Sequence, residues 1–384
     1  MKVYLDNAAT TPVDERVVEL MTRVLAENYG NPSSVHSQGR KARTLIEQSR
    51  KKVAKALGVA PGEVFFTSGG TEADNMALNC AVEDLGCDHI IVSPIEHHAV
   101  LYTAEHLSRS RGVKLSEVNI LENGHIDTDH LKQLLTDNSD KKSIVCLMHA
   151  NNELGNMIDL SEIGGICKEH GAYFQTDTVQ TIGHWDVKPK EHGVHFLAAS
   201  AHKFNGPKGI GFIFIDESLQ VKPFIHGGSQ ERNMRGGTEN LAGIVGLAKA
   251  LEISLDEMTE VKALAMSLRQ HMISRLKDEI PGVSFNGDYE GRTNYIPLNV
   301  SFPAHEGGEM LLFNLDIAGI SVSGGSACSS GSSIGSHVLK AVSGDPNKTS
   351  IRFSFGKYNT KEEIDYTVDK LVEIITGVKK EVSA

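Results

Sequence analysis

The sequence has few cysteines, and their arrangement argues against two kinds of scaffold. There are five cysteines in 384 residues, an odd number, and no two of them form a CxxC pair. In a chain of this length, the pattern argues against a disulfide framework and against a structural zinc site. Internal repeats and low-complexity tracts are absent too, which argues against a solenoid or a linker-rich protein.

Long apolar runs and basic clusters are also absent. No run approaches the length that spans a bilayer, and residues 1–7 lack the apolar region of a signal peptide. We therefore expect a cytoplasmic protein with no membrane partner. The net charge is −11, from 38 Lys and Arg against 49 Asp and Glu, which disfavours binding to nucleic acid or to anionic membranes.

The pattern of strands and helices predicts an α/β fold with two domains. Hydrophobic residues make up 40% of the chain, enough for a sizeable core, and 384 residues exceed what one core usually holds. Apolar strands alternate with helices up to about residue 215, which is typical of a mostly parallel sheet covered on both faces. We expect a large domain at 13–256 and a smaller α+β domain formed by 1–12 and 257–384.

The predicted elements can be given by residue range. Strands are expected at 63–67, 89–92, 143–148, 172–176, 195–199 and 211–215. Helices are expected from about 13, from about 70 to 79, and at 39–57, 99–110, 127–135, 160–170, 238–255, 261–277 and 362–375.

Lys203 stands at the tip of one of these buried strands, before a Gly/Pro-rich turn. A lysine restrained in this way is partly desolvated, and burial lowers the pKa of an amine. A neutral amine can form a Schiff base, and pyridoxal 5'-phosphate (PLP) is the commonest cofactor that needs one. An ordinary surface lysine at a strand end is the alternative that this turn alone leaves open.

Polar residues follow the other strand ends, where ligands of open α/β sheets bind. Gly70 and Thr71 open a helix whose N-terminus suits a phosphate, although a plain N-cap is equally consistent. His97 could stack on a planar ring or simply cap a helix, and the pair Asn151-Asn152 could be a turn. Asp177 could bind a pyridine nitrogen or cap the next helix.

Longer motifs carry a resemblance to a known family over nearly the whole chain. The sequence resembles the cysteine desulfurases of the NifS/IscS type, in the class V aminotransferase group of PLP-dependent enzymes. The motifs are 6–11 (DNAATT), 67–72 (TSGGTE), 96–97 (EH), 151–153 (NNE), 200–203 (SAHK), 227–232 (GGSQER) and 235–240 (RGGTEN). The resemblance implies the fold-type I PLP-dependent transferase fold, a homodimer, and conversion of L-cysteine to L-alanine with the sulfur passed on as a persulfide.

The same resemblance assigns roles to individual residues. It implies that Lys203 holds PLP, that Asp177 pairs with the ring nitrogen, that Gln180 bonds the ring hydroxyl and that His97 stacks on the ring. The implied phosphate ligands are Gly70, Thr71, Ser200, His202 and, from the partner subunit, Thr238. Asn152, also near the cofactor, and Arg352 would bind the substrate carboxylate, since a guanidinium matches a carboxylate in bidentate fashion.

Cys328 is the candidate nucleophile. It lies in a small, polar, Gly/Ser-rich segment at about 321–335, which we expect to be mobile, with no apolar neighbours to bury the thiol. We interpret Cys80, Cys87, Cys146 and Cys167, in helix, turn or strand contexts, as buried small hydrophobic residues. The expected chemistry is attack of the Cys328 thiolate on the substrate sulfur, with Lys203 as base and His97 as a proton shuttle.

Other activities and the sulfur acceptor stay open at this stage. The alternatives are a selenocysteine lyase, another class V aminotransferase or lyase, and a non-enzymatic scaffold that binds sulfur-transfer partners. An iron–sulfur scaffold protein is the expected acceptor. Few residues follow the last predicted helix, however, whereas IscS-type members carry a longer C-terminal extension that docks the scaffold, so the pathway is not assigned.

Overall fold

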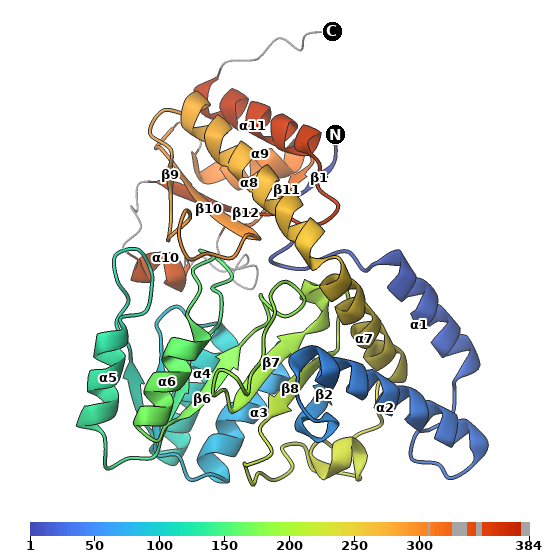
Figure 1. The fold of residues 1–384 in the computed structure, drawn as a ribbon. Helices are drawn as coiled ribbons and strands as arrows, with labels where there is room; N and C mark the ends of the chain where they lie inside the picture. Colours follow the sequence, from blue (N-terminus) through green and yellow to red (C-terminus); the bar gives the residue numbers. More distant parts are fainter. Residues whose placement is uncertain (306–307, 325–335, 343–347, 378–384) are drawn as a thin grey trace.

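A seven-stranded sheet forms the centre of the computed structural model, which describes residues 1–305, 308–324, 336–342 and 348–377 (Figure 1). In spatial order the strands are β2 (Val64–Thr67), β8 (Gly211–Ile215), β7 (Phe196–Ser200), β6 (Tyr173–Asp177), β5 (Ser143–Cys146), β3 (His89–Val92) and β4 (Lys114–Glu117). Only β8 runs antiparallel to its neighbours, β2 and β7. The predicted mostly parallel α/β sheet is confirmed.

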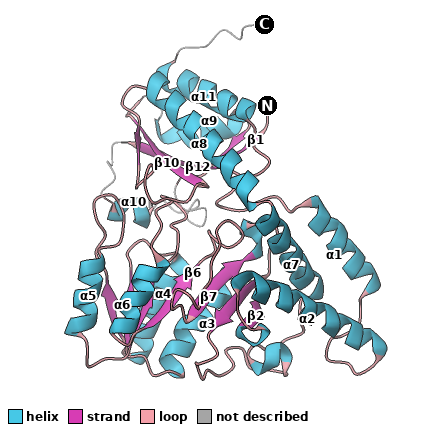
Figure 2. Cartoon of the chain, in the orientation of Figure 1, coloured by secondary structure: helices cyan, strands magenta, loops and turns pink. Residues whose placement is uncertain are grey.

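Helices cover both faces of this sheet, as Figure 2 shows. They are α1 (Glu15–Glu27), α2 (Ser37–Leu57), α3 (Gly70–Glu83), α4 (His98–Arg111), α5 (Thr128–Asp137), α6 (Leu160–Glu169) and α7 (Leu241–Asp256). Successive residues of β8 point to opposite faces: Phe212 packs with the apolar residues of α2, α6 and α7, and Ile213 with those of α3 and α4. Burial on both faces explains why the strands are continuous apolar runs.

The last third of the chain builds its own core together with the first residues. Its elements are α8 (Met258–Glu279), β9 (Ser284–Phe285), β10 (Pro297–Phe302), α9 (Leu311–Ile317), β11 (Ile320–Ser321), α10 (His337–Ala341), β12 (Thr349–Ser354) and α11 (Lys361–Thr376). β12, β10 and β9 form an antiparallel sheet. β1 (Val3–Tyr4) pairs in parallel with β11, and Val3 and Leu5 join the apolar cluster of α8 and α11.

The differences from the predicted elements have local causes. The helix expected from 238 begins at Leu241, because the Asn240 side chain caps it by accepting a hydrogen bond from the Gly243 N–H at 3.0 Å. β4 was not predicted, since Lys114–Glu117 is a partly exposed edge strand without an apolar run. β12, α9 and α10 were also missed. No helix in the described ranges is long and apolar enough to cross a membrane.

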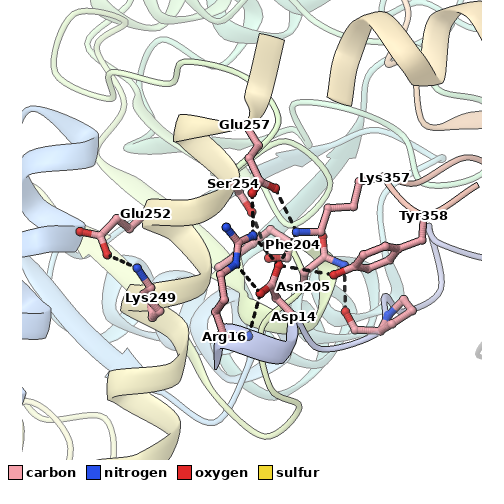
Figure 3. A network of polar contacts seen from close by, with 11 residues as sticks. Asp14, Arg16, Phe204, Asn205, Lys249, Glu252, Ser254, Glu257, Lys357 and Tyr358 are labelled. Carbon is pink, nitrogen blue, oxygen red and sulfur yellow. Dashed lines mark hydrogen bonds and ion pairs between the residues drawn. The ribbon is translucent and has the colours of Figure 1, made fainter. Parts of the chain in front are cut away.

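A network of charged side chains around the buried Asp14 joins α1, the junction of α7 and α8, and the loop between β12 and α11 (Figure 3). Asp14 caps α1 by accepting from the Arg16 N–H at 3.0 Å, and its carboxylate also pairs with the Arg16 guanidinium at 2.8 Å. Lys357 contacts both Asp14 and, at 3.1 Å, Glu257. The hydrogen bond from Arg16 holds the pKa of the Asp14 carboxyl well below its usual range.

Asp14→Ala should lower the free energy of unfolding by about 2 kcal/mol, because it removes a helix cap and leaves the partly buried Lys357 with one partner fewer. Urea unfolding at pH 7 measures the loss. Since the folded pKa of Asp14 is depressed, its contribution is present above the unfolded pKa and is lost as the pH falls through the folded pKa. The difference from the parent chain should therefore shrink on acidification.

Glu252→Ala is the matched control for this prediction. Glu252 pairs with Lys249 at 3.1 Å in the same region of Figure 3, but both side chains are about one-third exposed. An exposed pair contributes about 0–1 kcal/mol. An equal decrease in the free energy of unfolding for the two variants would contradict a larger contribution from the Asp14 network.

Candidate active site

One cavity of about 200 Å³ lies at the carboxyl ends of β6 and β7, next to the start of α3. It brings together ten of the twelve residues that the sequence proposed for the site. These are Gly70, Thr71, His97, Asn152, Asp177, Gln180, Ser200, His202, Lys203 and Arg352. The cavity is also lined by Ala8 and Ala9, from the loop after β1, and by Asp74 of α3.

Two proposed residues do not line this cavity. Thr238 lines a separate pocket of about 240 Å³, together with Arg235 and Glu239. Its proposed contact is with the partner subunit's site, and a single chain does not test it. Cys328 lies outside the described residues.

Lys203 is held at the cavity by backbone oxygens from the N-terminal loop. Its Nζ donates hydrogen bonds to the carbonyls of Ala8 at 2.6 Å and Ala9 at 2.8 Å. The Lys203 carbonyl accepts from His184 Nε2 at 2.9 Å. The lysine is therefore restrained at both its backbone and its amine, as expected for a strand-tip residue. Nothing in the sequence pattern indicated that two alanine carbonyls would be its partners.

The N-terminus of α3 forms the polar end of the cavity. A Cβ added at Gly70 would lie 2.6 Å from Cγ2 of Val179, and one at Gly211 would lie 2.3 Å from the carbonyl of Ala199. Only glycine permits this close approach of the turn to the sheet. Free backbone N–H groups at a helix start suit a phosphate.

Two histidines in the cavity are neutral at physiological pH. Burial, with a smaller contribution from the nearby Lys203, lowers the pKa of His202 to about 4. Burial likewise lowers the pKa of His97 to about 4. Nδ1 of His97 accepts a hydrogen bond from the Ala99 N–H at 3.1 Å, so the ring hydrogen is on Nε2. His97 thus caps α4 and also lines the cavity. The two roles that the sequence left open for it, helix cap and site residue, are therefore compatible.

Asp177 is a buried carboxyl at the end of β6. It accepts from the Val179 N–H at 2.8 Å, and burial raises its pKa to about 6. Gln180, beside it, donates from Nε2 to the Ala8 carbonyl at 2.9 Å. A buried carboxyl of this kind is well suited to pair with a cationic ring nitrogen.

Sequence reasoning missed two further buried carboxyls. Asp74 accepts from Gln175 Nε2 at 2.9 Å, and burial raises its pKa well above the usual range. Glu96 accepts from the Ser93 hydroxyl at 2.6 Å and from the Met148 N–H at 2.8 Å, and burial raises its pKa to about 8. The burial of Asp74 could have been predicted from the sequence, because this acidic residue lies on the apolar side of a helix, with Ala73 and Ala77.

Arg352 reaches the cavity from β12 and is 1% exposed. Its Nη1 donates to the Asn152 carbonyl at 2.9 Å, and its Nη2 donates to Asp6 Oδ1 at 2.9 Å. Nε is buried and, among the described residues, has no hydrogen-bond partner. A buried donor without a partner is costly. The guanidinium of a cavity residue therefore keeps one N–H without a partner among the described residues.

The cavity thus combines a restrained lysine, a helix start for a phosphate, a buried carboxyl and an arginine, which are the donor set of a PLP site. A protein-family model described as aminotransferase class-V matches residues 3–367. The chain belongs to this family, whose members depend on PLP.

Within the family, the relatives are cysteine desulfurases. A cysteine desulfurase IscS from Dictyoglomus turgidum is 45% identical, with 98% of this chain and 95% of the relative covered. Another IscS, from Methanosarcina thermophila, is 42% identical over 98% of this chain and 93% of the relative.

Solved structures agree with these relatives. A NifS-like protein has a TM-score of 0.90 and 38% identity, covering 98% of this chain and all of that one. A structure titled "SspA in complex with cysteine" has a TM-score of 0.81 and 30% identity, covering 94% of this chain and all of that one. The expected fold-type I PLP-dependent fold is confirmed, and so is the cysteine desulfurase family.

The four cysteines in the described ranges are all buried and free, which confirms their interpretation as small hydrophobic residues. Burial raises the pKa of Cys80, Cys87 and Cys167 to about 12 and that of Cys146 well above its usual range. None of them can supply a thiolate near neutral pH.

Native alkylation at pH 8 should therefore spare these four thiols and modify Cys328. At a pKa of about 12, roughly one thiol in ten thousand is ionised at pH 8, before steric protection is counted. Iodoacetamide labelling followed by peptide mass spectrometry measures each site. In denaturant all five should react. Rapid native labelling of Cys80 or Cys167 would contradict the burial argument.

Proposed function

We propose that this protein removes sulfur from L-cysteine, leaving L-alanine, with PLP bound at Lys203 and Cys328 as the sulfur carrier. The observation that carries the proposal is the convergence of Lys203, Asp177, His97 and Arg352 in one cavity. These residues come from four separate parts of the chain, and ordinary folding requirements give no reason for all four to meet.

The residues that would hold the cofactor are those that line the cavity, together with one residue of the partner subunit. Lys203 would bind its aldehyde, Asp177 would pair with its ring nitrogen, Gln180 with its ring hydroxyl, and His97 would lie against the ring. Its phosphate would bind at Gly70, Thr71, Ser200 and His202 and at the partner's Thr238. When bound, PLP supplies an electron sink that labilises bonds at the substrate Cα and Cβ.

Substrate orientation is assigned to Arg352 and Asn152. Arg352 lines the cavity, and its buried Nε has no hydrogen-bond partner among the described residues. A substrate carboxylate would accept from it, and the Asn152 side chain lines the same wall. Lys203 Nζ is then the base for the proton on Cα, and His97 Nε2, which carries a hydrogen, is the candidate proton donor.

Cys328 is close in sequence to a residue that pairs with the backbone of Arg352. It is five positions after Ser323, whose N–H donates to the Arg352 carbonyl at 3.3 Å and whose carbonyl accepts from the Arg352 N–H at 2.7 Å. Five residues span at most about 17 Å. In the net reaction the C–S bond of cysteine is replaced by C–H while an S–S bond forms on Cys328, so no outside oxidant is needed.

The wider setting of the activity also belongs to this proposal. A homodimer would bring the partner's Thr238 to the phosphate. Two domains, 13–256 and 1–12 with 257–384, would have the cavity between them. The relatives' name, cysteine desulfurase IscS, supports a role in sulfur delivery, including iron–sulfur cluster assembly through a scaffold protein, and we propose that this takes place in the cytoplasm.

Lys203→Ala should abolish the visible absorbance of bound PLP and reduce alanine formation below detection, because no other amine lines the cavity among the described residues. Absorbance spectra and alanine assays with L-cysteine measure this. Lys208→Ala, an exposed lysine five positions on, is the control and should behave as the parent. Pyruvate in place of alanine from the parent enzyme would instead indicate a lyase.

Cys328→Ser should keep the cofactor absorbance and lose persulfide formation, since the remaining thiols are buried with raised pKa values. Trapping with an alkylating reagent after addition of L-cysteine, followed by mass spectrometry, detects the persulfide. Cys80→Ala is the matched control and should retain it. Persulfide in the Cys328→Ser variant would refute the role of Cys328.

A further inference from the structure

The turn after β7, which carries Lys203, is held by side chains from three separate segments. The three consecutive carbonyls of residues 202–204 each accept a hydrogen bond from one of them. In chain order, the donors are Thr11 Oγ1 at 2.9 Å, His184 Nε2 at 2.9 Å and Ser254 Oγ at 3.1 Å. The next residue, Asn205, has a φ of 60°, a left-handed conformation that few residues other than glycine adopt. The shape of this turn therefore depends on side chains elsewhere in the chain.

His184, the donor to Lys203, is buried and is itself held by the last third of the chain. The Tyr295 hydroxyl donates to the His184 carbonyl at 3.2 Å, and the two rings lie edge to face with their centroids 6.1 Å apart. Burial lowers the pKa of His184, so the ring is neutral and its hydrogen is on Nε2, the atom that donates to the Lys203 carbonyl. These contacts set both the orientation of the ring and its tautomer.

The residue before His184 packs closely against the same turn. Gly183 has a φ of +82°, and a Cβ added there would lie 2.7 Å from Cβ of Phe204 and 3.2 Å from Cβ of Ser254. Only glycine permits this backbone conformation together with this close approach. His184 is absent from the described residues that line the cavity. Any effect of its side chain on the site is therefore transmitted through Lys203.

From these contacts we propose that His184 is a positioning residue for Lys203, whose backbone it holds in one place while the amine acts. Once Nζ bonds to the cofactor carbon it keeps at most one hydrogen, so at least one of its hydrogen bonds to Ala8 and Ala9 is lost. The hydrogen bond from His184 to the Lys203 carbonyl does not depend on the state of the amine. This inference rests on the proposed role of Lys203, and catalytic geometry of this kind tolerates little displacement.

The test uses a reaction that needs Lys203 but not Cys328. In D2O, the PLP-loaded enzyme should exchange the Cα proton of L-alanine for deuterium with Lys203 Nζ as the base, and NMR measures the rate. His184→Ala should lower the maximal exchange rate about ten-fold. The half-saturating concentration of alanine should not change, because Arg352 would still bind the carboxylate. The affinity of the PLP-stripped full chain for PLP, measured by absorbance titration, should also fall about ten-fold.

His184→Gln keeps an N–H donor near the place of Nε2 and should restore most of the exchange rate and of the PLP affinity. His89→Ala is the matched control. His89 is also fully buried, and each of its ring nitrogens contacts a serine hydroxyl at 2.9 Å, but it begins β3, at the opposite end of the sheet from the cavity. This variant should have a lower Tm and the exchange rate of the parent.

An unchanged exchange rate and PLP affinity in His184→Ala would overturn the positioning role. So would a failure of His184→Gln to restore them, or an equal loss in His89→Ala, because those results indicate a contribution to stability alone. If His184→Ala does not fold, Tyr295→Phe removes only the hydroxyl that orients the ring and should slow exchange about three-fold; no change there would then overturn the role. Exchange that persists in Lys203→Ala would refute the proposed function itself, which is a distinguishable outcome.

Discussion

The buried guanidinium of Arg352 is the interaction on which the site depends. Desolvating an arginine is costly unless its donors are satisfied, and its partners here are distant in sequence. Asp6 follows β1, Asn152 belongs to the central part, and Ser323 pairs with the Arg352 backbone. The three segments are held together by their contacts with Arg352, and the cavity lies where they meet. Its Nε keeps no partner among the described residues, so this structural side chain is also the one that we propose binds the substrate carboxylate.

A second constraint is electrostatic and concerns three buried carboxyls. Burial is the largest cause of their raised pKa values, which are well above the usual range for Asp74, about 8 for Glu96 and about 6 for Asp177, and the charge of Asp177 adds to the rise at the other two. Neighbouring like charges disfavour simultaneous ionisation. Asp177 has a lower pKa than Glu96, because it lies near Lys203 and accepts from a backbone N–H. It is also the cavity residue that we propose pairs with a ring cation.

Much of this could be predicted from local sequence. Apolar strands and helix caps fix the central sheet, and the rule that ligands bind at strand ends points to Asp177 and Lys203. Contacts made by backbone atoms could not be predicted, because Ala8 and Ala9 bind Lys203 through carbonyls that any residue carries. Pairings across the whole chain, such as Asp6 with Arg352, depend on how the last third packs with the first residues.

The cysteines show why chemistry and packing are separated in this fold. A thiol in the core is stabilised as a small apolar group, and the same burial raises its pKa until it cannot act as a nucleophile. A sulfur carrier must therefore lie outside the core, where packing cannot hold it in place.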